Sequence, residues 1–99
     1  MIEAFETPVS VARAVAERAK QRRTAMRLTQ AELAQKAGLS LSTYRRFEQS
    51  GQIAFSSLLQ IAFALDCLRD FNALFAGTSW ATMDDMLKQV KPAKRVRHD

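Results

Sequence analysis

The sequence predicts an all-α fold: a domain of five helices over residues 1–77, followed by a short C-terminal extension over residues 78–99. Two observations carry this prediction. Glycine and proline are scarce, at three and two of 99 residues, while alanine and leucine are abundant, which favours helix over strand. Apolar residues recur at helical spacing in segments that open on serine or threonine, the residues that cap helix N-termini. A chain of this length can build one small core but not two.

The first helix is expected from Pro8 to Met26. Thr7 can accept hydrogen bonds from the free amides of the first turn, and proline suits the first helical position because it has no amide hydrogen. One apolar stripe follows at helical spacing, formed by Val11, Ala12, Val15, Ala19 and Met26.

The second helix is expected to be about eight residues long and to begin after Thr29. Thr29 and Glu32 form a capping-box pattern, in which each side chain accepts a hydrogen bond from the other residue's backbone amide. Gly38 then ends the helix, because glycine adopts the left-handed conformation at the least cost. The helix-turn-helix unit is therefore expected over residues 29–49.

The third helix is expected from Leu41 to Gln49, with Ser40 as its cap. A projection at 100° per residue separates two faces. The inward face carries Leu41, Tyr44, Phe47 and Glu48. The outward face carries Ser42, Arg45, Arg46 and Gln49, with Thr43 on the flank.

The fourth helix is expected over "SLLQIAFALD", capped by Ser56 or Ser57 and central because it is apolar on nearly all sides. A short fifth helix is expected from about Arg69 to Phe75. An amphipathic segment and a basic, proline-broken end follow.

The charge indicates the class of partner. The net charge is +5 and the pI about 10, so nucleic acid is the first candidate, an acidic protein the second and an anionic membrane the third. No apolar run approaches the ~20 residues of a membrane span, and the N-terminal stretch lacks the pattern of a signal peptide. The lone Cys67, expected in the core, fits a reducing compartment, and we expect a cytoplasmic protein.

No group of residues predicts catalysis, a metal or a cofactor. His98 is the only histidine, and Asp84-Asp85 reads as a charge pair at a helix start. No nucleophile with a neighbouring base and no phosphate-binding loop is present, so we do not expect an enzyme.

Two short helices joined at a glycine, the second with a polar and cationic outer face, form the plan of a DNA-binding helix-turn-helix. A helix fits the major groove, where an arginine such as Arg46 can donate two hydrogen bonds to guanine. Ser42 and Thr43 can contact base edges or phosphate, and Gln49 extends this face. Gln30 and Arg45 are expected at the DNA backbone.

The stretch "LTQAELAQKAGLSLSTYRRFEQSGQ" closely resembles the helix-turn-helix of the phage-repressor family, also called the XRE family. The similarity spans about residues 18–75. It rests on Thr29-Gln30, Glu32-Leu33-Ala34, Gly38, Ser42-Thr43, Arg46 and Glu48.

This resemblance implies a five-helix bundle that binds a palindromic operator in double-stranded DNA as a homodimer. It places Gln30 at the DNA backbone and turns Leu41, Ser42, Thr43 and Arg46 toward the groove. It also implies a structural ion pair between Glu48 and Arg23 of the first helix. The sequence departs from the family pattern at Tyr44, an inward position usually held by an aliphatic residue, so its hydroxyl needs a partner.

Apolar residues near the C-terminal end exceed what a small bundle must bury, which predicts an interface. The expected interface residues are Phe71, Leu74, Phe75, Trp80 and Met83. Homodimerisation is the first explanation. A second protein is the other, because the size and tail resemble HipB-like antitoxins, which bind HipA-type toxin kinases.

We therefore expect a sequence-specific repressor, and within this class an autoregulating antitoxin-type component. The alternatives are a stand-alone phage-type repressor, a protein-interaction adaptor on a helix-turn-helix scaffold, and a non-specific nucleoid-type DNA binder.

Overall fold

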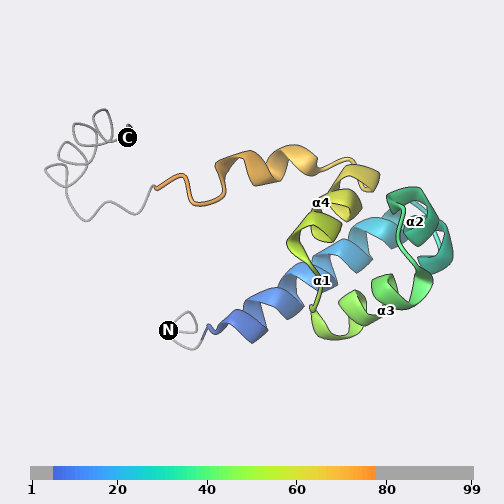
Figure 1. The fold of residues 1–99 in the computed structure, drawn as a ribbon, viewed down its shortest axis with the longest axis horizontal. Coiled ribbons are helices and arrows are strands. Elements are labelled where there is room, and N and C mark those ends of the chain that lie inside the picture. The colour runs from blue at the N-terminus through green and yellow to red at the C-terminus, as the bar shows by residue number, and fades with distance from the viewer. Residues whose placement is uncertain (1–5, 78–99) are drawn as a thin grey trace, which may run out of the picture.

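The computed structural model describes residues 6–77, and the regular structure in this range is entirely helical (Figure 1). The elements are α1 (Pro8–Ala25), α2 (Gln30–Ala37), α3 (Leu41–Ser50), α4 (Phe55–Ala64) and a 3₁₀ helix, η2 (Leu68–Ala73). The predicted all-α fold of five helices is confirmed. Among residues 6–77, no helix combines the length and apolarity that a membrane crossing requires.

The predicted helix starts of α1 and α2 are confirmed, each with a reciprocal capping box. In α1, Thr7 caps the helix together with Ser10. In α2, the Thr29 hydroxyl accepts from the Glu32 amide at 3.0 Å, and the Thr29 amide donates to the Glu32 carboxylate at 2.8 Å. These bonds satisfy backbone donors that have no partner within the helix.

The core lies where α1 packs against α3 and where α2 packs against α3 and α4. Alanines occupy many of the buried positions, so that the helices can approach one another closely. The buried cluster consists of Ala16, Leu33, Ala34, Ala37, Tyr44, Phe47, Ile61, Ala64 and Leu65.

The buried face of α1 differs from the expected stripe. Val11 and Met26 are 44% and 37% exposed, whereas Ala16 and Arg23 are buried. Val15 and Ala19 of the expected stripe do pack against the core, beside the buried Ala16, and Arg23 joins α1 to α3 through Glu48. Apolar spacing alone does not reveal this, because a buried arginine does not count toward an apolar stripe.

The start of α4 was predicted wrongly. The helix begins at Phe55, and its N-cap, Ala54, makes no side-chain hydrogen bond, so neither Ser56 nor Ser57 caps it. It is buried on one side only, since Phe55 and Phe63 are 55% and 71% exposed. The fifth element is also shorter and tighter than expected, ending at Ala73 as a 3₁₀ helix.

Arg22 ties α1 to the end of α4. Its Nε donates to the carbonyl of Leu65 at 2.7 Å, and its Nη2 donates to the carbonyl of Asp66 at 3.2 Å. A cation at this position satisfies carbonyls that the helix leaves open and interacts favourably with the helix dipole.

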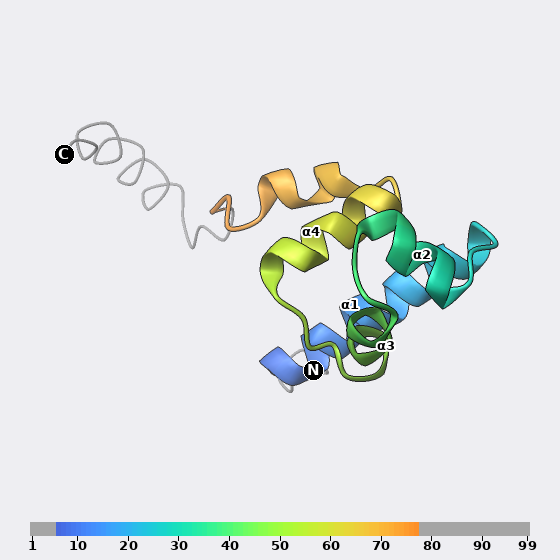
Figure 2. The same cartoon turned by 45° about the vertical axis from the view of Figure 1, so that its right-hand side comes forward.

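The positions of η2 and α3 decide which surfaces of the domain are separate. η2 packs on α4, and in both Figure 1 and Figure 2 it lies on the opposite side of the described chain from α3. A surface on η2 is therefore separate from a surface on α3.

Candidate nucleic-acid interface

The turn between α2 and α3 is set by Gly38. Its φ of 75° is left-handed, and the amide of the next residue, Leu39, donates to the carbonyl of Ala34 at 2.8 Å. Glycine tolerates this conformation because it has no Cβ. Ser40 then caps α3 by accepting from the amide of Thr43 at 3.1 Å. The sequence thus fixes where α3 begins relative to α2.

The outer face of α3 is polar, cationic and exposed. The residues that reach solvent are those predicted to face DNA, namely Ser42, Thr43, Arg45, Arg46 and Gln49. Leu41, at the start of α3, and Gln30, at the start of α2, are half-buried beside this face.

Hydroxyl groups gather at the N-terminal end of α3. The Ser40 hydroxyl donates to the Thr43 hydroxyl at 2.8 Å and lies 3.3 Å from that of Ser42. Thr43 therefore accepts a hydrogen bond within the protein while its own hydrogen stays available. This arrangement orients Thr43 to donate outward, to a base edge or a phosphate.

An ion pair joins α1 to the inner face of α3. Arg23 donates through Nε to Glu48 Oε2 at 2.7 Å and through Nη2 to Glu48 Oε1 at 3.2 Å, and the two side chains are 10% and 4% exposed. Arg23 Nη1 also donates to the carbonyl of Leu28 at 2.7 Å. The guanidinium therefore connects α1, the loop before α2, and α3.

Two further groups complete the hydrogen bonding of Glu48. The Tyr44 hydroxyl donates to Oε2, which supplies the partner that this inward tyrosine requires. Gln30 Nε2 donates to Oε1 at 2.9 Å. Burial by itself raises the pKa of the Glu48 carboxyl, but hydrogen bonds from Arg23, Tyr44 and Gln30 outweigh it, so the pKa lies below its ordinary value.

The Tyr44 hydroxyl stays protonated as a donor in this network. Its pKa is raised first by burial and then by its hydrogen bond to the Glu48 carboxylate. A negative charge on the tyrosine beside a carboxylate would be strongly unfavourable.

The carboxylate of Glu48 also fixes the orientation of Gln30. Because an ionised carboxylate only accepts hydrogen bonds, the NH₂ group of Gln30 must face it. The carbonyl oxygen of Gln30 then faces outward and accepts from Arg45 Nε at 3.4 Å. Gln30 was predicted at the DNA backbone, and the structure adds that it bridges the buried ion pair and Arg45.

The structure also places a residue beside Arg46 that the sequence did not single out. Gln52, in the turn after α3, accepts a hydrogen bond from Arg46 Nη2 at 2.6 Å. A glutamine in a turn carries no local signal for this contact, because the contact depends on how the turn folds back along α3.

Four large apolar side chains toward the C-terminal end of the described chain are exposed, and we refer to them together as the apolar surface: Phe63 on α4, Leu68 on η2, and Leu74 and Phe75 after it. These side chains are 71%, 40%, 47% and 98% exposed, in that order. Phe71, which was predicted in an interface, is half-buried and contacts Phe55 edge-on, with ring centroids 6.2 Å apart. The other predicted interface residues, Trp80 and Met83, lie outside the described residues.

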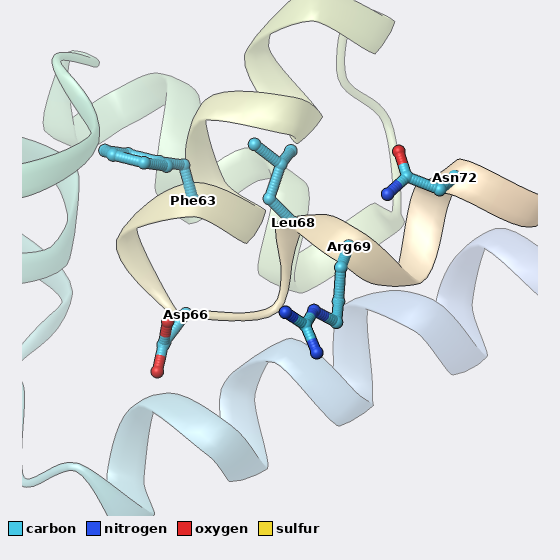
Figure 3. A pocket seen from close by; sticks show the side chains of 5 residues that line it. All are labelled: Phe63, Asp66, Leu68, Arg69 and Asn72. Atoms are coloured by element: carbon cyan, nitrogen blue, oxygen red, sulfur yellow. The ribbon is translucent and has the colours of Figure 1, made fainter.

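A pocket of about 330 Å³ opens beside this apolar surface, between the end of α4 and η2 (Figure 3). Phe63 and Leu68 supply its apolar part. Asp66, Arg69 and Asn72 supply polar groups around it.

The remaining candidates for chemistry are a cysteine packed against the core and residues outside the described chain. Cys67 is half-buried against the core, and burial raises the pKa of its thiol, so it resembles a structural cysteine rather than a reactive one. Within residues 6–77, no three His, Cys, Asp or Glu residues are grouped as metal ligands. Asp84, Asp85 and His98 lie outside that range.

Comparison with known proteins agrees with this geometry. A family model described as helix-turn-helix matches residues 20–71, more than half of the chain, from the last third of α1 into η2. No curated protein matches the sequence. The matched range holds the exposed face of α3, the glycine turn and both partners of the Arg23–Glu48 ion pair. The chain therefore belongs to the XRE-type helix-turn-helix family of DNA-binding transcriptional regulators.

Proposed function

We propose that this protein is a sequence-specific repressor whose α3 enters the major groove of its operator. The observation that carries the proposal is the contrast between the two faces of α3. On its inner face, the buried Glu48 carboxylate accepts hydrogen bonds from the side chains of Arg23, Gln30 and Tyr44. Its outer face presents exposed hydroxyls and guanidinium groups. A rigid helix with a free polar face is what base readout requires.

The residues along this DNA-binding face have different contacts with the operator. Arg46, on the outer face, donates to guanine O6 and N7, and Thr43 and Ser42 donate to nearby base edges or phosphates. Leu41 contacts a thymine methyl group. Arg45, Gln30 and Gln49 contact the sugar-phosphate backbone, where they set the register of the helix on the DNA.

We propose that a second copy of the chain covers the apolar surface of Phe63, Leu68, Leu74 and Phe75. A symmetric dimer places the same surface on both subunits, which suits a self-complementary apolar patch. Since η2 and α3 lie apart in the described chain, a dimer that forms through η2 and the residues after it leaves the outer face of α3 uncovered in both copies. To bind a palindromic operator, the two-fold axis of the dimer must present both α3 helices to one side of the duplex, at half-sites about 34 Å apart.

The decisive test of DNA readout is Arg46→Ala. Duplexes that the wild-type protein selects from a random pool provide the probe, and affinity is measured for each single-base variant. We expect a loss of about 1–3 kcal/mol that is concentrated at one base position. Arg18→Ala is the control, because Arg18 lies about 140° around α1 from Arg23, away from α3. It should lower affinity little and equally for all sequences.

Other outcomes of the same experiment identify the rival functions. If the random pool yields no preferred sequence but binding falls steeply with salt, the protein is a non-specific DNA binder. If Arg46→Ala leaves DNA binding unchanged, Arg46 does not read a base. If the wild-type protein binds no duplex, the helix-turn-helix serves as a scaffold for protein interaction.

Sedimentation of Phe75→Asp tests the dimer. A charge in a dimer interface should give monomers, whereas Val9→Asp, at a 62% exposed position at the start of α1, should leave the dimer intact. A Phe75→Asp protein that remains dimeric would rule out this surface as the dimer interface.

We further propose that the regulator is the autoregulating, antitoxin-type component of a toxin–antitoxin module, with a HipA-type toxin as its second partner. The support is the resemblance of the chain's size and basic tail to those of HipB-like antitoxins. Co-expression with the product of the adjacent gene tests this role. A stable complex with a kinase-like neighbour supports it, and a neighbour that neither binds nor inhibits growth contradicts it.

A further inference from the structure

We propose that Gln52 is a positioning residue that pre-orients Arg46 for base readout. This inference rests on the proposed DNA-reading function and adds to it a specificity-determining residue outside α3. The residue that sets the orientation of Arg46 then lies in the turn that follows α3.

Arg46 belongs to a closed chain of hydrogen bonds with Ser50 and Gln52. Arg46 Nη2 donates to the side-chain carbonyl of Gln52 at 2.6 Å, and the backbone N–H of Gln52 donates to the Ser50 hydroxyl at 3.1 Å. The Ser50 hydroxyl in turn donates to the backbone carbonyl of Arg46 at 2.7 Å. The guanidinium of Arg46 is thereby linked back to its own backbone through two neighbouring residues, which restricts the directions that it can take.

The turn that carries Gln52 is itself held against α1. Gly51, between Ser50 and Gln52, is left-handed with φ 81°, and its amide donates to the carbonyl of Phe47 at 2.7 Å. A Cβ on Gly51 would lie 2.7 Å from the backbone carbonyl carbon of Ala12. The turn therefore packs directly on the backbone of α1, and this contact fixes the position of the Gln52 backbone.

The chemistry of glutamine suits this task. A neutral amide oxygen holds the guanidinium without cancelling its charge, as a carboxylate would. Arginine has five N–H donors, and the bond to Gln52 uses one of them. The remaining donors suffice for a paired contact with guanine O6 and N7. Holding a long side chain in place before binding reduces the entropy lost when the complex forms.

The test uses the full-length protein and duplexes that the wild-type protein selects from a random pool. Gln52→Met keeps the length of the side chain and removes the acceptor. We expect affinity to fall about two- to tenfold, the effect of ordering one long side chain on binding. The base preference at the position read by Arg46 should weaken as well. Gln35→Met, at an exposed position in the last turn of α2, is the matched control and should change neither the affinity nor the base preference.

A double-mutant cycle separates positioning from direct contact with DNA. If Gln52 acts through Arg46, Gln52→Met should lose most of its effect in an Arg46→Met background. If the affinity losses of Gln52→Met and Arg46→Met add fully in the double variant, Gln52 contacts DNA by itself and the proposal is overturned. Gln52→Glu restores an acceptor, so it should recover the base preference while a charge near phosphates lowers the affinity. Failure to recover the preference would also count against positioning.

The failures of the two proposals are distinguishable. A random pool without an enriched sequence overturns the proposed function, and the role of Gln52 with it. An enriched site for which Gln52→Met keeps full affinity and base preference overturns the role of Gln52 alone. Thermal unfolding of each variant accompanies these measurements, and Gln52→Met should unfold at the wild-type temperature because Gln52 is exposed.

Discussion

Removing Arg23 is the sharpest test of how this domain holds its recognition helix. Arg23→Met keeps most of the volume and the apolar stem of the side chain but removes every hydrogen bond of the guanidinium. Glu48 then keeps Tyr44 and Gln30 as donors but loses its counter-ion, while its side chain is only 4% exposed. The carbonyl of Leu28 loses its partner as well.

The expected loss of stability follows from these contacts. Breaking one partner of a buried ion pair costs about 3–5 kcal/mol when the remaining charge is uncompensated. Here two hydrogen bonds to Glu48 survive, which places the expected loss near the lower end, at about 3 kcal/mol. For a domain with a stability of about 5–10 kcal/mol, this change lowers the unfolding temperature by more than ten degrees.

The pH dependence of the loss provides a second, independent signature. In the wild type, the folded-state pKa of Glu48 lies below its unfolded value, so its contribution is present at neutral pH and is lost as the pH falls through the folded pKa. Without Arg23, the largest lowering influence on the Glu48 pKa is lost while burial still raises it, so the pKa rises relative to the wild type. The variant should then gain stability relative to the wild type as the pH falls from 7 toward 4.

Urea unfolding at several pH values measures both effects, provided that the slope of the transition is unchanged. Arg18→Met is the control and should change the free energy of unfolding by less than about 0.5 kcal/mol, because Arg18 is exposed. Arg23→Met combined with Glu48→Met should be more stable than Arg23→Met alone. A loss below about 1 kcal/mol at pH 7, or a loss that does not change with pH, would refute this account of the ion pair.

Further predictions concern the glycine turns and the tyrosine behind α3. Gly38→Ala should cost about 1–2 kcal/mol for the left-handed backbone, since a Cβ there meets its nearest atom, in Gln60, at an ordinary 3.5 Å. Gly51→Ala should cost at least about 3 kcal/mol in urea unfolding, because the same backbone strain is joined by a clash with Ala12; equal losses at the two glycines would contradict this. Tyr44→Phe should lower stability by about 1 kcal/mol through the lost hydrogen bond to Glu48, and an unchanged unfolding midpoint would exclude that contribution.

The sequence predicted the features of the fold that depend on neighbouring residues. The capping box at Thr29 and the left-handed Gly38 are local signals, because each side chain or backbone conformation acts within one helical turn. The start of α4 was predicted wrongly because its N-cap gives no such local side-chain signal. Ala54 caps that helix through its backbone alone, so the serines that follow it carried a misleading signal.

The parts of the site that the sequence did not predict depend on tertiary contacts. Arg22 binds carbonyls 43 and 44 residues further along the chain, and Gln30 donates to Glu48 across 18 residues. No spacing rule connects such positions. Arg23 and Glu48 are also 25 residues apart, and their pairing was expected only through the resemblance to a family. Arg46 and Gln52 lie closer in sequence, but their contact requires the Gly51 turn.

The residues that hold α3 in place act at its two ends and along its inner face. The residues that stabilise the fold are therefore different from those that contact DNA. Ser40 fixes the first turn, Glu48 fixes the inner face, and Gly51 holds the end of the helix against α1. None of these residues belongs to the exposed face. Substitutions on that face should therefore change which DNA sequence is bound while leaving the free energy of unfolding nearly constant. Gln52 lies where the two sets meet, since its backbone belongs to the restraining turn and its side chain to Arg46. It is the position at which a change outside α3 should alter specificity without loosening the fold.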